Sequence, residues 1–245
     1  MTSTASAAEF LPAEHPHHER PAAEFRHVTS GVRRHGRYHV HVDAVSLEIR
    51  RAEVTTLLSR HDRSAGSLLD LLDGRASSSW GSVRVAGREL SGLDRGERYR
   101  LRYGQVARVQ PGYGIYPKLT VRQNLVIARR RSGQPADLGW IDQVTEALEL
   151  GGMLGYHDAP GADVRRARWA VARSLVGGPA LLLIDHVSAA GAWPDKPGLM
   201  DALRLATHQL GVAAVVATRD PWTAAATDRV VRMNRGKVLD DTGAL

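Results

Sequence analysis

The chain has 245 residues, of which 43% are hydrophobic, so it can bury the core of one large α/β domain or of a domain with an inserted subdomain. It has no cysteine, which excludes disulfides and thiolate metal sites, and no apolar run approaches the ~18–20 residues of a membrane-spanning helix. The formal net charge is +7, but the arginines are spread along the chain. We therefore expect a soluble protein with a solvated basic surface, and we do not expect nucleic acid as its partner.

The chain divides by composition into a tail and a folded region. Residues 1–23 are rich in Ala, Ser, Thr, Pro and His without hydrophobic periodicity, which predicts a disordered tail. Residues 24–243 have the patterning of one folded domain. From Phe25 to Ile49, apolar and polar residues alternate, as at Val40 and Val42, and this period of two predicts β-strands.

Four patterns follow up to residue 110. Glu53–Leu58 predicts a buried strand, and Leu68–Leu72 predicts the helix after it, with Gly74 as its C-cap. Gly81–Leu90 predicts a small β-hairpin, and Tyr103–Gln110 predicts a strand that ends at a glutamine. A loop, residues 59–67, must therefore join the first strand to the first helix.

Helices are expected between residues 121 and 155. Ile141, Val144 and Leu148 recur at the helical period and predict one apolar face. Beyond them, a helix is expected to end before Gly177–Pro179, because two glycines and a proline stop a helix.

The segment Ala180–Asp185 is the organising element of the sequence. Four apolar residues that run directly into an aspartate predict a strand buried on both faces, with a carboxylate at its carboxyl end. Gly211–Thr218 predicts a second strand of this kind. In open α/β sheets, ligands bind at the carboxyl ends of such strands, so we expect a ligand beside Asp185.

This order of elements resembles the ATPase subunits of ABC transporters. In that family a helix ending in ARAL, a short turn with a proline and a strand ending in LLLDEP recur together, as Ala172–Pro179 and Ala180–Asp185 do here. Tyr116–Leu125 is similar to the YPxLTVxENL segment that follows the family's Q-loop, and the resemblance extends from about Phe25 to Gly243. It implies a P-loop NTPase fold of the α/β class. The RecA-like core would be residues 24–110 and 165–243, with a β-rich N-terminal subdomain and a helical subdomain at about residues 111–164.

The resemblance also implies ATP and Mg²⁺ as cofactors. His35 takes the position whose side chain stacks on adenine, with Tyr38 as a nearby substitute, and Gln110 takes the Q-loop position. Asp185 and Gln110 are the expected metal-site residues. The phosphate-loop positions are filled by Ser59, Arg60, His61, Asp62, Arg63, Ser64, Ala65, Gly66 and Ser67.

The phosphate loop departs from the family pattern G-x-x-x-x-G-K-[ST], whose glycines and lysine hold the phosphates. The glycine positions are Ser59 and Ser64, the lysine is Ala65, the magnesium-binding hydroxyl is Gly66, and Asp62 adds negative charge. Losing the lysine and the backbone cradle together is expected to cost about 4–6 kcal/mol, or roughly 10³–10⁴ in affinity.

Four more family motifs are altered. His186 stands where relatives have the glutamate that polarises the attacking water, and Arg219 stands at the switch histidine. Ala192 replaces the D-loop aspartate, and Gly161–Arg165 stands where LSGGQ is expected.

These departures favour a degenerate transporter subunit with weak or no ATP hydrolysis. By resemblance it would dock on a transmembrane permease through the Q-loop region, pair with a like or unlike nucleotide-binding subunit, and lie in the cytoplasm, peripheral to the inner face of the plasma membrane. Two alternatives stay open. One is a regulatory or scaffolding protein, conceivably a nucleic-acid binder; the other is an active ATPase that uses Arg60 or Arg63 for phosphate and His186 for water.

Overall fold

The computed structural model describes residues 20–60, 62–109, 116–157, 163–185 and 196–243. The first described residues already belong to the fold: Ala22 is buried and donates a hydrogen bond to Ile49, and strand β1 begins at Ala23. The described fold therefore includes Ala22 and Ala23, which composition alone would assign to the tail. In the part of the chain that is described, no helix is long and apolar enough to cross a membrane.

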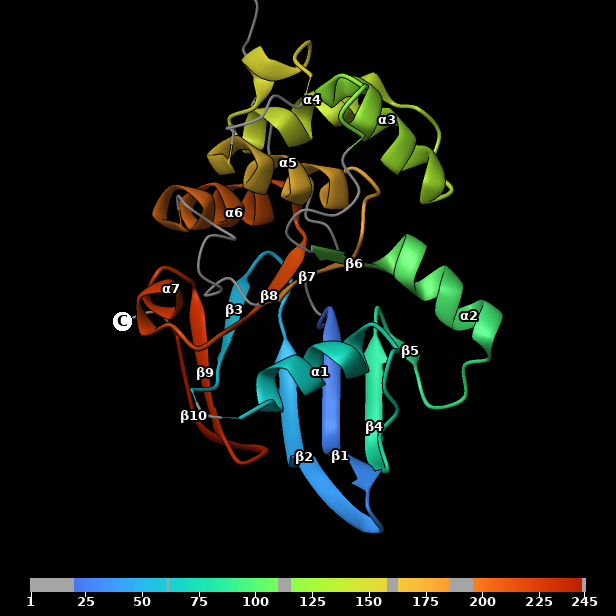
Figure 1. Cartoon of the computed structure of the whole chain (residues 1–245), viewed down its shortest axis with the longest axis vertical. Helices are drawn as coiled ribbons and strands as arrows, with labels where there is room; N and C mark the ends of the chain where they lie inside the picture. The colour runs from blue at the N-terminus through green and yellow to red at the C-terminus, as the bar shows by residue number, and fades with distance from the viewer. Residues whose placement is uncertain (1–19, 61, 110–115, 158–162, 186–195, 244–245) are drawn as a thin grey trace, which may run out of the picture.

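The N-terminal β-rich region forms an antiparallel sheet, at the bottom of Figure 1. Its strands follow the order β2 (Arg37–Ile49), β1 (Ala23–Arg34), β4 (Trp80–Val85) and β5 (Arg88–Glu89). The strands expected between Phe25 and Ile49 and the hairpin expected at Gly81–Leu90 are therefore confirmed.

A second sheet forms the core of the molecule. Its strands follow the order β10 (Lys237–Gly243), β9 (Arg229–Asn234), β3 (Val54–Leu58), β8 (Ala213–Thr218), β7 (Leu181–Asp185) and β6 (Val106–Val109). All neighbouring pairs are parallel except β10 and β9. Every residue of β3 and β8 is buried, as expected for strands covered on both faces.

Helix α1 (Ser64–Leu72) lies between the two sheets, and its leucines pack with both of them. The opposite face of the core sheet is covered by α3 (Val121–Arg131), α4 (Leu138–Ala147), α5 (Asp163–Leu175) and α6 (Lys196–Leu210). Alternate residues of β7 pack on opposite sides of the core sheet, because successive side chains of a strand point to opposite faces. Leu181 and Leu183 pack with the α1 layer, whereas Leu182 and Ile184 pack with the helical layer.

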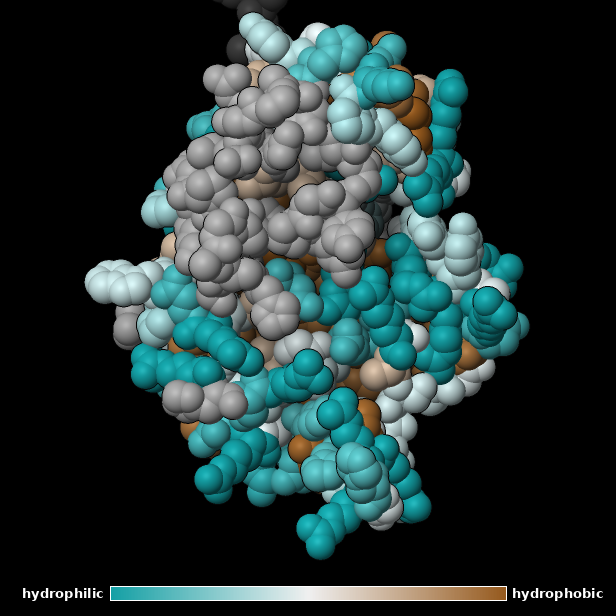
Figure 2. Space-filling view, viewed as in Figure 1, coloured by the Kyte–Doolittle hydropathy of each residue, from teal (hydrophilic) through white to brown (hydrophobic). Residues whose placement is uncertain are grey.

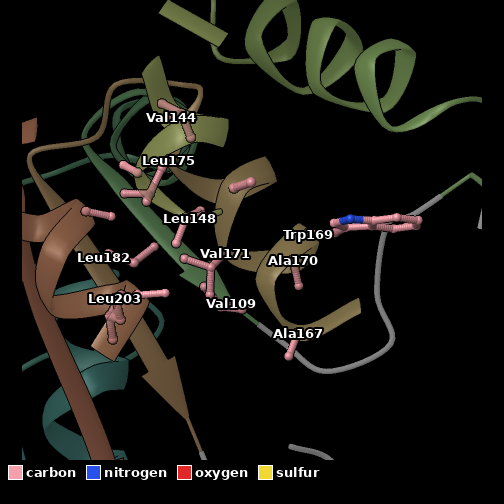
Figure 3. Packing of buried hydrophobic residues seen from close by; sticks show 14 of the residues in the cluster. Val109, Val144, Leu148, Ala167, Trp169, Ala170, Val171, Leu175, Leu182 and Leu203 are labelled. Atoms are coloured by element: carbon pink, nitrogen blue, oxygen red, sulfur yellow. The ribbon is translucent and has the colours of Figure 1, made fainter. Parts of the chain in front are cut away.

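The expected apolar face of α4 is confirmed. Figure 3 shows Val144 and Leu148 among the buried side chains that also include Leu175 of α5, Leu182 of β7 and Leu203 of α6. On the face shown in Figure 2, by contrast, hydrophilic side chains predominate over the antiparallel sheet.

One expected strand is partly wrong. Among the described residues of the segment Tyr103–Gln110, Val106–Val109 form strand β6, whereas the first three belong to a π-helical turn, Leu101–Gln105; Gln110 lies outside the described residues. The turn continues α2 (Arg95–Arg100), whose start is fixed by a capping box in which Asp94 and Glu97 bond each other's backbone N–H. The remaining short elements are η2 (Gly151–Met153) and α7 (Pro221–Ala225).

Candidate functional site

A cleft of about 590 Å³ opens where β3, β7 and β8 end and α1 begins. This is the edge at which the sequence predicts a ligand. Of the predicted site residues, the cleft is lined by Ser59, Asp62, Arg63, Ala65, Gly66, Ser67, Asp185 and Arg219. The β3–α1 loop, the end of β7 and the segment after β8 therefore converge, as the sequence pattern requires.

The carboxylate of Asp62 is bound by its own loop. Its Oδ1 accepts hydrogen bonds from the Ser64 backbone N–H at 2.8 Å and from the hydroxyls of Ser59 and Ser64 at 2.5 Å each. Its Oδ2 accepts the backbone N–H of Arg235 at 2.5 Å. Burial alone would raise the pKa of Asp62, but these hydrogen bonds outweigh it and hold the pKa below its ordinary value.

The Asp62 carboxylate thereby takes the place of an external anion. The first N–H groups of a helix are the donors that a phosphate loop offers to phosphate, and here the Ser64 N–H at the start of α1 is donated to Asp62. The Ser64 hydroxyl also accepts the Gly236 N–H at 2.8 Å, which ties the loop to the turn between β9 and β10. Ser64 thus bonds both the Asp62 carboxylate and the β9–β10 turn.

A buried arginine binds three aspartates at one side of the cleft. Arg108 of β6 has a side chain only 8% exposed and donates to Asp70 at 2.7 Å, to Asp73 at 2.9 Å and to Asp185. Burial alone would lower the pKa of Arg108, but the three carboxylates outweigh it and raise the pKa. Burial raises the pKa of Asp73, and Arg108 and Arg75 offset part of that rise.

Groups that would meet a magnesium triphosphate at this edge already have partners within the chain. Arg108 already binds the carboxylate of Asp185, the residue predicted at the metal, and Asp62 already binds loop donors that phosphate requires. Ala65 supplies no charge at the lysine position. Within the described ranges, no group of three or more histidine or acidic side chains is placed to hold a metal ion.

Several predicted residues lie elsewhere. Ser64 is buried beneath the cleft, and Arg60 is exposed and absent from its described lining. His35 lies in the exposed turn between β1 and β2, and Tyr38 of β2 bonds Ser79 at 2.5 Å; neither contributes to the described lining. His61, Gln110 and His186 lie outside the described residues, as do Gly161, Ala162 and Ala192.

Sequence reasoning missed Arg108 and its partners Asp70 and Asp73. One signal was present, since an arginine interrupts the otherwise apolar segment Val106–Val109, and a charge inside a buried strand requires partners. These two partners could not be named, because they lie 38 and 35 residues away in the sequence.

The chain was compared with known proteins. No protein-family profile matches it. It is 30% identical over 202 residues to the lipoprotein-releasing system ATP-binding protein LolD of Xanthomonas campestris pv. campestris (strain 8004), covering 81% of this chain and 84% of that protein. It is 28% identical to the macrolide export ATP-binding/permease protein MacB of Marinobacter nauticus and 29% identical to the spermidine/putrescine import ATP-binding protein PotA of Oleidesulfovibrio alaskensis. Those matches cover 82% and 80% of this chain, but the chain spans only about a third of MacB (31%) and half of PotA (52%).

Solved structures share the fold. The ATP-binding cassette MJ0796, in a dimeric post-hydrolysis state bound to ADP and Pi, superimposes with a TM-score of 0.73 at 19% identity, covering 91% of this chain and 99% of that one. The cbiO1 subunit of the Clostridium perfringens cbiONQ transporter complex gives 0.77 at 18% identity, with 92% and 89% covered. The expected α/β P-loop NTPase fold is thus confirmed.

Proposed function

The chain belongs to the family of ATP-binding subunits of ABC transporters, and we propose that within this family it is a degenerate subunit with weak or no ATP hydrolysis. The observation that carries the proposal is the Asp62 carboxylate held by four hydrogen bonds from Ser59, Ser64 and Arg235. A triphosphate entering this loop must break some of these bonds and lie beside a negative charge. Charge-assisted hydrogen bonds contribute about 1.5–3 kcal/mol each, so losing two lowers affinity by roughly 10²–10⁴.

The acidic side of the cleft supports the same proposal. A magnesium ion bound to Asp185 competes with the Arg108 guanidinium for the carboxylate. Displacing that guanidinium leaves Arg108, with only 8% of its side chain exposed, short of one partner. The loop that would bind the phosphates and the carboxylate that would bind magnesium thus both have partners within the protein.

Nucleotide binding and turnover by the purified protein test the proposal. Titration with ATP and Mg²⁺ is expected to give dissociation constants at least about 10²-fold weaker than those of a family member with an intact loop, and no turnover near ~1 s⁻¹. Hydrolysis at about 1 s⁻¹ that disappears in Asp185→Asn would overturn it. The double variant Asp62→Gly with Ala65→Lys reverses two departures and is expected to tighten ATP binding.

The segment after the Q-loop position is the proposed docking surface for a transmembrane permease. Asn124 is buried and fixes the segment: it accepts the Tyr116 N–H at 2.7 Å and donates to the carbonyl oxygens of Tyr116 at 3.2 Å and Thr120 at 3.0 Å. Tyr116 and Lys118 themselves are exposed. A rigid turn with exposed side chains therefore supports a binding role for the segment.

Docking predicts that the pair of changes Tyr116→Ala and Lys118→Glu reduces co-purification with a permease subunit from membranes. Trp222→Ala, which removes an exposed aromatic on α7, is the matched control. Undiminished co-purification of the double variant would contradict docking. In this proposal the protein lies on the cytoplasmic face of the membrane as a peripheral subunit, paired with a like or unlike nucleotide-binding subunit.

A further inference from the structure

A second cleft, of about 430 Å³, is lined by arginines. It lies between the Leu101–Gln105 turn, β6 and the carboxyl-terminal ends of α3 and α5. Arg102, Arg131 and Arg173 line it, and its described lining includes no aspartate or glutamate. Arg108 lines it too, but its guanidinium is bound to three carboxylates of the first cleft.

Arg173 is the central group of this cleft. It is half-buried, and its Nε is buried without a hydrogen-bond partner among the described residues. Burial lowers the pKa of Arg173, and the neighbouring Arg131 lowers it further, while Tyr116 acts weakly in the opposite direction. A guanidinium nevertheless stays charged at neutral pH, so this charge needs an anion that the described chain does not supply.

The groups around Arg173 do not neutralise it. Arg131 lies over the ring of Tyr103, with its Cζ 5.9 Å from the ring centroid, and reaches the Tyr116 hydroxyl only at 3.5 Å. Among the described residues, neither Arg102 nor Arg131 forms an ion pair.

Two serines also line the cleft, and their hydroxyls are already committed. Ser132 donates to the Ala128 carbonyl at 3.2 Å, and Ser174 donates to the Ala170 carbonyl at 2.9 Å. These serines therefore add no counter-charge to the arginines.

The helix ends offset only part of the positive charge. α3 and α5 both end at the cleft, and the end of each helix carries roughly half a negative charge. Two helices thus contribute about one negative charge against the three positive charges of Arg102, Arg131 and Arg173. About two positive charges are left without compensation. A phosphate group carries about two negative charges at neutral pH and would neutralise them.

We propose that this cleft binds the phosphate group of a phosphorylated small molecule or of a lipid headgroup. Guanidinium groups present a planar fork of N–H donors that matches phosphate oxygens, and three of them line one cavity. The site is separate from the phosphate loop, since none of the loop residues lines it. It therefore does not depend on whether the first cleft binds nucleotide.

Titration of the whole protein with inorganic phosphate, at constant ionic strength maintained with chloride, tests the site. Arg173→Gln is expected to weaken phosphate binding about tenfold or more. The matched control Arg130→Gln removes the same charge from an exposed position of α3 outside the cleft. The control is expected to change binding less than about twofold, which is within the range of surface charge effects. Equal binding by wild type and Arg173→Gln, or an equal loss in Arg130→Gln, overturns the proposal.

Thermal unfolding separates a binding role from a structural one. Without phosphate, Arg173→Gln is expected to unfold at the same temperature as wild type or higher, because it removes a charge without a partner. Phosphate is expected to raise the unfolding temperature of wild type but not of the variant. A variant that is destabilised without phosphate assigns the guanidinium a structural role and refutes the site.

Vesicles identify the source of the phosphate group. With phosphatidic acid vesicles, loss of sedimentation in Arg173→Gln but not in Arg130→Gln assigns the cleft to a lipid headgroup. Equal sedimentation of wild type and both variants, together with the loss of inorganic phosphate binding in Arg173→Gln, assigns it to a soluble phosphorylated ligand.

Discussion

Asp62 is a negative charge at a position of the phosphate loop. The pH dependence of the unfolding free energy measures how much its hydrogen bonds stabilise the carboxylate. Its pKa lies below the ordinary value, so its stabilising effect is full above pH ~3.9 and is lost as the pH falls through the folded-state pKa. Asp62→Asn removes the carboxylate and turns an amide N–H toward the backbone N–H of Arg235 or toward Ser64. We expect a loss of about 1–2 kcal/mol in unfolding free energy at pH 7 that shrinks below pH ~4.

Urea unfolding of wild type and Asp62→Asn at pH 7, 5 and 3.5 measures this difference. Asp142→Asn is the control, because Asp142 is exposed and its ion pair with the partly exposed Arg122, at 3.1 Å, is open to solvent. If the difference in unfolding free energy between wild type and Asp62→Asn stays constant across the three pH values, the pKa of Asp62 is not lowered by folding.

Arg108 is expected to stabilise the fold through its buried ion pairs. Arg108→Met leaves Asp73, only 2% exposed, and Asp185 without their shared cation. Breaking a buried ion pair in this way costs about 3–5 kcal/mol. Burial already raises the pKa of Asp73, and without the cation it rises further, so the destabilisation is expected to be largest at neutral pH and to shrink as the pH falls and Asp73 takes up a proton.

Chemical denaturation of Arg108→Met, compared with Arg75→Met, checks the prediction. Arg75 binds the same Asp73 at 3.1 Å, but 46% of its side chain is exposed. The control is expected to lose less than about 1 kcal/mol. Equal losses in the two variants would mean that burial of the guanidinium is unimportant.

At the scale of elements, α3 begins with a turn that rests on one buried amide. Asn124 bonds the backbone of Tyr116 and Thr120 and also donates to the Leu119 carbonyl at 3.3 Å. Asn124→Ala leaves these groups without their partner, and we expect a loss of about 2–3 kcal/mol together with faster amide exchange across residues 116–120. Gln123→Ala removes only the exposed half of the Thr120 capping box and is expected to lose about 0.5–1 kcal/mol. Similar exchange rates in both variants would show that the capping box, and not Asn124, stabilises the turn.

The elements also show what could be predicted from the sequence. Strands β7 and β8 were predictable because their apolar runs are nearly continuous, and β3 because it combines apolar and β-branched residues. Helix α4 was predictable from its helical period. The turn Leu101–Gln105 was not predictable from apolar periodicity, because it continues helix α2, which has no buried residue and hence no apolar face. The phosphate loop was located by its place between strand and helix, but the inward turn of Asp62 depends on Arg235, which is 173 residues away.

At the scale of the whole molecule, one arginine joins the two sheets. Arg229 of β9 donates through two nitrogens to Asp241 of β10, at 2.7 Å each, and to the Glu48 carbonyl of β2 at 2.7 Å. The bonds to Asp241 are the largest influence on the pKa of Arg229, which is raised, and they lower the pKa of Asp241. A side chain that is 9% exposed therefore connects the antiparallel sheet to the core sheet at their junction.

Arg229→Gln tests whether the two sheets unfold together because of this connection. The variant loses the fork to Asp241 and the bond to β2, and we expect about 2–3 kcal/mol less stability, since Asp241 is partly exposed and regains water. Arg232→Gln on the same strand is the matched control: its pair with Asp240, at 3.4 Å, is exposed on both sides and contributes less than about 1 kcal/mol. If the sheets depend on Arg229 for their coupling, hydrogen exchange of the β1 and β2 amides and of the α3 and α4 amides will show unfolding at separate urea concentrations in Arg229→Gln only. Coincident transitions in the variant would instead assign the coupling to the apolar layer around α1, which contacts both sheets independently of this arginine.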